Sequence, residues 1–225
     1  MGIIVIVVII FVVYLIKGNI YAKNERKKEE NRKILNIKPV EKKDLHYPIV
    51  LSPKNVKLVL PTQIHYYYDE SPKRGASDLF FAQKLKKYFS NVSTDLKLGR
   101  FFPDIVLYNE MAKFYLDIEI DEIYTTNEVY NLKRKMVIHS MGDDDFRNNY
   151  FLNKGWYVLR FSEEQVRKET ESCCKFVAQV YAYYALDKTP LNKLQTVRDL
   201  SFSEQWSKEI GNFHIRNNSR REWLN

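Results

Sequence analysis

Apolar and polar residues alternate over several short stretches in the middle of the chain, as they do in β-strands with one buried face. The two clearest stretches, Phe101–Tyr108 and Phe114–Glu122, are separated by five residues, a length suited to a hairpin. Three further stretches have the composition of strands: Val56–Leu60, the region near Val92–Leu98, and Trp156–Phe161.

Apolar residues three and four positions apart predict helices around these strands. Ser77 is the expected N-cap of a helix over Asp78–Phe89, and Gly155 is the expected end of one over Asp143–Lys154. A long helix is expected from Glu163 to about Leu186. Two stretches are less regular: a short helix near Ser203–Ile210, and Thr125–Met136, which fits a helix or an excursion from the sheet. The order αβββαβ(α) predicts a mixed α/β domain rather than a doubly wound parallel sheet.

The N-terminus is strongly apolar: the 14 residues Ile3–Ile16 carry no charge and are almost all β-branched or aromatic. About 20 helical residues cross a bilayer, a length reached when the neighbours up to Tyr21 are included. A signal peptide would need a basic start and a small-residue cleavage site, myristoylation would need Ser or Thr in place of Ile6, and a buried strand would be unusually long. We therefore expect a single-pass transmembrane anchor over residues 1–21, with the lipid membrane as its partner.

Basic side chains follow at once, because Lys17–Lys33 holds seven Lys and Arg against three Glu. Positive charge beside a membrane span stays in the cytoplasm, so we expect the rest of the chain there. Residues 22–45 are then a basic juxtamembrane linker, either solvated or touching anionic lipid. We expect the folded domain over residues 46–188 and a helical C-terminal appendage over residues 189–225.

The net charge of +8 does not by itself indicate binding to nucleic acid. Residues 1–43 hold ten Lys and Arg and four Glu, which accounts for +6, so the expected folded domain is nearly neutral. Cys173 and Cys174 are neighbours outside any CxxC pattern, so we expect ordinary helix residues rather than a disulfide framework or a zinc site.

One strand carries three acidic side chains on a single face. The acids Asp117, Glu119 and Asp121 alternate with the apolar Leu116, Ile118 and Ile120. Carboxylates this close repel each other, and exposure to water or a divalent cation would relieve the repulsion. Asp104 on the preceding strand of the hairpin could add a ligand, and metal-bound water attacking a phosphodiester is chemistry that such a site supports. A solvated acidic strand face is the alternative.

Three motifs in order, FPDIVLY, DIEIDE and FRNNYFLNKGWYVLRFSEEQV, resemble the PD-(D/E)XK, or restriction-endonuclease-like, superfamily. The very-short-patch-repair-endonuclease-like branch is the most similar, and the resemblance covers about Arg74–Tyr184. It implies a restriction-endonuclease-like αβββαβ core with a mixed sheet. It also implies a nuclease that uses Mg²⁺ or Mn²⁺ to hydrolyse phosphodiester bonds, with DNA as the expected substrate class.

The same resemblance implies roles for seven residues. Asp104 and Glu119 would bind the metal, and Asp121 would be a third catalytic residue where the superfamily usually has lysine. The supporting residues are Asp78 on the first helix, His139 after the acid pair, and Arg147 and Arg160 as phosphate contacts. Arg160 could equally pair with an acid beside its strand.

The missing lysine is the main departure from the superfamily, because that residue normally helps to orient or activate the attacking water. Lys133 or Lys135 could supply it from the inserted segment Tyr124–Ile138. We expect a membrane-anchored, metal-dependent endonuclease. Two alternatives remain open: a catalytically inactive domain that binds nucleic acid or a protein partner, and a structural module at the membrane.

Overall fold

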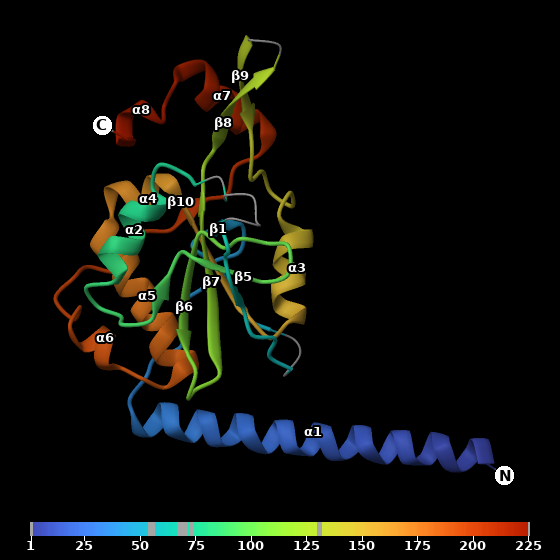
Figure 1. Ribbon diagram of the computed structural model, residues 1–225. Coiled ribbons are helices and arrows are strands. Elements are labelled where there is room, and N and C mark those ends of the chain that lie inside the picture. Colours follow the sequence, from blue (N-terminus) through green and yellow to red (C-terminus); the bar gives the residue numbers. More distant parts are fainter. Residues whose placement is uncertain (1, 54–56, 67–71, 73, 130–131, 225) are drawn as a thin grey trace.

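A five-stranded mixed sheet forms the centre of the protein, as a computed structural model shows (Figure 1). The structure describes residues 2–53, 57–66, 72, 74–129 and 132–224; within this range, the side chains of residues 2–5, 7, 8, 126–129 and 132–134 are not described. The strands lie in the order β2 (Ile49–Leu51), β10 (Tyr157–Ser162), β7 (Phe114–Asp121), β6 (Ile105–Asn109) and β4 (Val92–Ser93). Strands β7 and β10 are parallel and the other neighbours are antiparallel, which confirms the predicted mixed α/β sheet.

The central strand β7 is buried on both faces. Leu116, Ile118 and Ile120 pack against α2 (Asp78–Leu85) and α5 (Thr170–Ala185), which confirms the predicted apolar face. The opposite face is covered by α3 (Asp145–Asn153), so helices lie on both sides of the sheet (Figure 1). The acids of β7 are therefore enclosed under α3 rather than spread over a solvated strand face.

Most predicted helices are present with different ends. The long helix expected from Glu163 is interrupted at Glu169, which separates α4 (Glu163–Lys168) from α5. Gly155 follows α3 with a φ of +81°, the left-handed conformation that ends a helix. Ser77 precedes α2 but does not cap it, because its hydroxyl donates to Glu163 Oε1 at 3.1 Å instead.

Several local predictions were wrong. Lys57–Leu60 forms no strand, and Val56 lies outside the described residues. The single strand expected near Val92–Leu98 is divided into β4 and β5 (Leu96–Lys97), and β5 pairs with β3 (Thr62–Gln63). In contrast, one of the two alternatives for Thr125–Met136, an excursion from the sheet, agrees with the structure, because this segment lies within a separate antiparallel hairpin made of β8 (Tyr124–Val129) and β9 (Leu132–Val137).

The C-terminal residues pack back on the domain, although the sequence suggested an appendage. The helix expected near Ser203–Ile210 begins later, because β11 (Ser203–Glu204) pairs with β1 (His46–Tyr47). Trp206 is buried against Tyr47 with ring centroids 5.0 Å apart. The remaining elements are α6 (Thr189–Asn192), α7 (Lys208–Asn217), which contacts β8 and β9, and α8 (Arg221–Leu224).

A single long helix, α1 (Gly2–Ile34), covers both the expected anchor and most of the expected linker. Its C-terminal end meets the domain at α5, where Arg32 Nε donates to the Tyr183 carbonyl at 3.0 Å (Figure 1). Among the residues that the structure describes, no helix combines the length and the apolar character needed to span a bilayer. The transmembrane anchor predicted over residues 1–21 is therefore unsupported.

Candidate functional site

Asp104 and Glu119 lie together where β6 begins beside β7. The antiparallel register pairs Ile105 of β6 with Ile118 of β7. Asp104, which precedes Ile105, therefore lies next to Glu119, which follows Ile118. The Asp104 N–H donates to Glu119 Oε1 at 3.2 Å, and Asp104 Oδ2 accepts from the Ile120 N–H at 2.9 Å. The structure therefore brings the two predicted metal ligands together. The side chain of each one accepts a hydrogen bond from a backbone N–H on the other side of the pair of segments.

The electrostatics of these two carboxyl groups differ. Burial raises the pKa of Asp104 well above its ordinary value, and the charges of Glu119 and Asp78 raise it further. Burial also raises the pKa of Glu119, but Arg147 and Arg160 outweigh that effect and lower it overall. Glu119 is therefore the ionised member of the pair, and Asp104 is the member that holds a proton more tightly.

Asp78 adds a third carboxyl group from the N-terminal end of α2. Its Oδ2 accepts a hydrogen bond from the Gly75 N–H at 2.7 Å. Burial raises the pKa of Asp78 to about 7, with contributions in the same direction from Glu122 and Glu119. This residue, predicted as a supporting acid, is electrostatically connected to the Asp104–Glu119 pair.

Arg147 reaches the acids from α3 on the opposite side. One of its nitrogens, Nη2, donates to Glu119 Oε1 at 2.5 Å and to the Phe102 carbonyl at 3.0 Å. Burial would lower the pKa of Arg147, but the carboxyl groups of Glu119, Asp117 and Asp104 raise it overall. A residue predicted to contact phosphate is thus engaged with one of the predicted metal ligands.

Asp117 is a buried acid that the sequence placed on the correct strand face but not in the site. Its side chain is completely buried, and its carboxyl group shares a hydrogen bond with that of Glu119. Burial and the charge of Glu119 raise its pKa well above the ordinary value. The feature of the sequence that could have identified Asp117 as part of the site is the alternation of side chains along the strand, because it orients Asp117 to the same face as Glu119.

Asp121, the third predicted catalytic acid, is engaged in a buried ion pair on the β10 side. Arg160 Nε and Nη2 donate to its Oδ2 and Oδ1 at 3.0 and 2.5 Å. The Tyr47 hydroxyl donates to the same Oδ2 at 2.8 Å. Arg160 is only 1% exposed. Of its two expected roles, phosphate contact and pairing with an acid, the structure shows the pairing with an acid.

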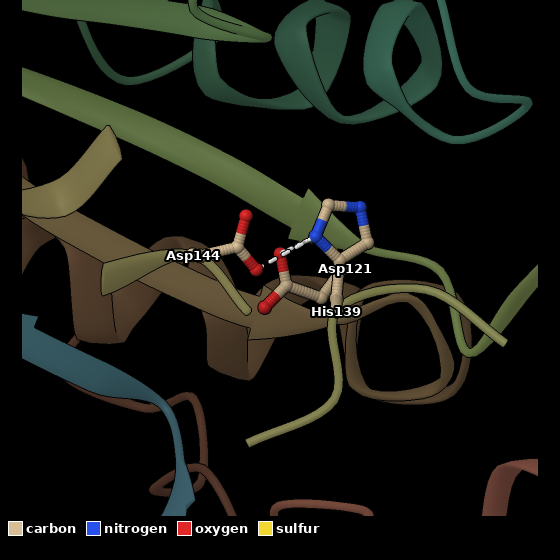
Figure 2. A group of neighbouring side chains, drawn as sticks. All are labelled: Asp121, His139 and Asp144. Carbon is tan, nitrogen blue, oxygen red and sulfur yellow. Dashed lines mark hydrogen bonds and ion pairs between the residues drawn. The ribbon is translucent and has the colours of Figure 1, made fainter. Parts of the chain in front are cut away.

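His139 and Asp144 complete this second cluster (Figure 2). His139 Nδ1 lies 2.8 Å from Asp144 Oδ2 and 3.8 Å from Asp121 Oδ1. Burial lowers the pKa of His139, but the hydrogen bond to Asp144 and the charge of Asp121 raise it overall. No pattern in the sequence pointed to Asp144 or Tyr47: Asp144 follows His139 by five residues, and Tyr47 contacts Asp121 from a segment 74 residues earlier.

The second cluster is, within the described part of the chain, the one set of three His, Cys or acidic ligand atoms that lie within 4.8 Å of each other. Arg160 Nη2 also lies 2.9 Å from Asp144 Oδ2 and 3.2 Å from His139 Nδ1. The guanidinium thus already provides the positive charge that a metal would bring. The cluster is better described as a buried charge network than as a metal centre.

The lysine expected in the superfamily is not replaced by Lys135. Its Nζ donates to Asn218 Oδ1 at 2.5 Å and lies 5.0 Å from the centroid of the Tyr124 ring, on the outer hairpin. The side chain of Lys133, the other candidate, lies outside the described residues.

No family model, curated protein or solved structure matches this chain.

Proposed function

We propose that this protein is a metal-dependent nuclease that hydrolyses phosphodiester bonds in DNA, with Asp104 and Glu119 as metal ligands. Two hydrogen bonds carry the proposal: the Asp104 N–H donates to Glu119 Oε1, and Asp104 Oδ2 accepts from the Ile120 N–H, which fixes two carboxyl groups beside each other in a buried place. The charge of Glu119 raises the cost of ionising Asp104, and a divalent cation would remove that repulsion. Mg²⁺ and Mn²⁺ prefer the oxygen ligands that both side chains offer.

The buried carboxyl group of Asp117, which shares a hydrogen bond with Glu119, adds a further oxygen beside this pair and supports a site built for a cation. A Mg²⁺ or Mn²⁺ ion would supply Lewis acidity at the phosphate and a more acidic water. Glu119, kept ionised by Arg147, would hold the cation across the whole neutral range. Asp78, with a pKa of about 7, exchanges its proton near neutral pH, which is what general acid–base catalysis requires.

A second candidate is a catalytically inactive nuclease-like domain that binds nucleic acid or a protein. The observation in its favour is the position of Lys135, which is bonded to Asn218 and not to the acids. Asp121, at the position where the superfamily has its lysine, is likewise held by Arg160. Tight binding of DNA in EDTA, with no cleavage when Mg²⁺ or Mn²⁺ is added, would favour this candidate.

Attachment to a membrane, with the folded domain in the cytoplasm, is also a proposal. The exposed apolar side chains of α1 support it, among them Ile10 at 64% and Phe11 at 62% exposure. Flotation with vesicles of neutral and anionic lipid tests it by comparing the full chain with an Ile10→Lys, Phe11→Lys variant. We expect only the unchanged chain to float, and recovery of both proteins in the lipid-free fraction would contradict the proposal.

A cleavage assay on supercoiled and linear DNA tests the nuclease directly. We expect nicking that requires Mg²⁺ or Mn²⁺ and that is lost in Asp104→Asn and Glu119→Gln. Glu110→Gln is the matched control, because Glu110 is an exposed acid at the turn between β6 and β7. Cleavage that persists in both site variants would overturn the proposal.

A further inference from the structure

Three aromatic rings lie in a row on α3 and the segment before β6. The ring centroid of Phe101 is 6.3 Å from that of Phe146 and 4.8 Å from that of Tyr150. Phe146 is 66% exposed, whereas Phe101 and Tyr150 are partly buried. One exposed aromatic residue is ordinary on a protein surface, but three adjoining rings offer a ligand an extended apolar surface. We call these three residues the aromatic row.

A tight turn holds Phe101 in the aromatic row. The Leu98 N–H donates to the Phe101 carbonyl at 3.0 Å, and the Phe101 N–H donates to the Leu98 carbonyl at 3.2 Å. Gly99 and Arg100 form the loop between them, and Gly99 has a φ of +60°. A Cβ atom at Gly99 would collide with Tyr150 Oη, so the loop packs directly against α3. The turn therefore presents the exposed Arg100 beside the rings.

Positive charge lies near every ring of the aromatic row. Arg100 Cζ is 5.2 Å from the ring centroid of Phe101 and 5.4 Å from that of Phe146. Lys154 Nζ is 5.6 Å from the ring centroid of Tyr150. Neither of these two cations forms an ion pair with an acid in the part of the chain that the structure describes. Both charges therefore remain available to an anionic ligand.

Arg147 connects the aromatic row to the proposed metal site. Its Cζ lies 5.5 Å from the ring centroid of Phe101, and its Nη2 donates to Glu119 Oε1 at 2.5 Å. The chain also runs directly from Phe101 to Asp104, the other proposed metal ligand. A strand of nucleic acid with one phosphate at the metal would therefore have its neighbouring nucleotides beside the row.

We propose that the aromatic row binds single-stranded DNA, with one unpaired base stacked on Phe146 and a neighbouring phosphate held by Arg100. The inference rests on the proposed nuclease function and names the form of its substrate. Every base has a π-face that stacks on an aromatic side chain, and stacking is therefore tolerant of sequence. In a duplex the neighbouring bases cover these faces, so the same surface favours an unpaired strand.

The charge of the domain also favours a single strand. Binding of duplex DNA without sequence preference depends mainly on the neutralisation of phosphates by Lys and Arg. The whole chain carries +8, but residues 1–43 account for +6, which leaves only +2 for the other residues. Asp145, the exposed residue before Phe146, weakens the attraction further at this place. Phosphate contacts alone therefore give a weak interaction, and a strand that can also stack has the advantage.

Fluorescence anisotropy of the full chain in EDTA, where a metal-dependent nuclease cannot cut, tests the binding. The probes are labelled oligodeoxythymidine and a duplex of the same length. We expect tighter binding of the single strand, weakened about fivefold or more by Phe146→Ala, with no change for the duplex. Phe213→Ala is the matched control, because Phe213 is a 54% exposed phenylalanine on α7. No loss in Phe146→Ala, or an equal loss for both probes, would overturn the proposal.

The salt dependence of binding separates the charge from the ring. Each phosphate contact contributes about 0.7 to the slope of log K against log salt concentration for a single strand. Arg100→Gln should therefore reduce this slope by about 0.7, whereas Phe146→Ala should leave it unchanged. Arg216→Gln, which removes an exposed arginine of α7, is the matched control. An unchanged slope in Arg100→Gln would contradict the phosphate contact.

Phe146→Trp covers the case in which the alanine variant fails to fold, because it keeps an aromatic ring at this position. Its additional fluorescence relative to wild type should be quenched by saturating oligodeoxythymidine and not by the duplex. Equal fluorescence with and without the single strand would contradict the stacking.

The two proposals fail in different ways. Metal-dependent cleavage by a protein whose binding of the single strand ignores Phe146 and Arg100 would reject the aromatic row alone. Binding of the single strand that depends on both residues, without cleavage in Mg²⁺ or Mn²⁺, would reject the nuclease and keep the row as a binding surface. Binding of neither probe by the wild-type protein would reject the row.

Discussion

Arg160 and Asp121 form a two-pronged ion pair in the interior, with nitrogen–oxygen distances of 3.0 and 2.5 Å. The pair joins the parallel neighbours β7 and β10, and Tyr47 adds a hydrogen bond from β1. Asp121 is thus held by Arg160 on the β10 side of β7, whereas Glu119 pairs with Arg147 and lies beside Asp104 on the β6 side.

The first prediction concerns this ion pair. Asp121→Ala leaves Arg160 buried with one carboxylate fewer, and breaking a buried pair in this way costs about 3–5 kcal/mol. Asp144, at 2.9 Å from Arg160, compensates in part, so the loss should lie near the lower end. Urea unfolding followed by circular dichroism measures it. Glu164→Ala, which removes an exposed pair with Lys168, is the control and should cost at most about 1 kcal/mol. An unchanged free energy of unfolding in Asp121→Ala would show that the pair does not stabilise the fold.

The second prediction concerns the pH dependence of stability through Asp78. Its pKa is about 7 in the folded protein and 3.8 ordinarily, so the folded state binds this proton more tightly than the unfolded state. The resulting stabilisation is complete below pH 3.8 and is lost as the pH rises through 7. Free energies of unfolding at several pH values between 4 and 8 should therefore fall more steeply for the wild-type protein than for Asp78→Asn. Parallel curves for the two proteins would exclude the raised pKa.

The third prediction concerns stabilisation by metal. A ligand that binds only the folded state at 100 times its dissociation constant adds about 2.7 kcal/mol. Mn²⁺ should therefore raise the melting temperature of the wild-type protein by several degrees, and it should have no such effect on Asp104→Asn or Glu119→Gln. Asp121→Asn should keep the response, since Asp121 belongs to the other cluster. If Asp121→Asn were the one variant whose melting temperature did not rise with Mn²⁺, the metal would be assigned to the cluster of Asp121, His139 and Asp144.

The fourth prediction concerns the missing lysine. Because Lys135 is bonded to Asn218, Lys135→Ala should keep its cleavage rate within about twofold of wild type, a change worth about 0.4 kcal/mol in the barrier. The rate is measured under single-turnover conditions in Mg²⁺. A much larger loss would indicate that the hairpin of β8 and β9 moves to bring Lys135 to the substrate.

The sequence predicted the part of the site that depends on local pattern. Alternation along Phe114–Glu122 is enough to predict Asp117 and Glu119 on one face, because it needs only the period of a strand. Asp104 was expected beside them through the resemblance to the superfamily, and the register of β6 with β7 is what brings it there.

The partners of these acids could not be predicted in the same way. Arg160 reaches Asp121 because β10 lies parallel to β7 in a specific register, and Tyr47 arrives from a segment 74 residues earlier. Such contacts are set by tertiary packing, which cannot be predicted from a local sequence pattern. The same applies near Gly155, where a Cβ atom would lie 2.9 Å from Leu58 Cα, so Lys57–Leu60 passes close to the end of α3 instead of forming a strand.

The most direct test of the metal site is a crystal structure of the full chain soaked in Mn²⁺, with anomalous differences measured to locate the ion. We predict a peak between the carboxyl groups of Asp104 and Glu119. A peak between Asp121, His139 and Asp144, or no peak at a Mn²⁺ concentration that supports cleavage, would contradict the proposed site.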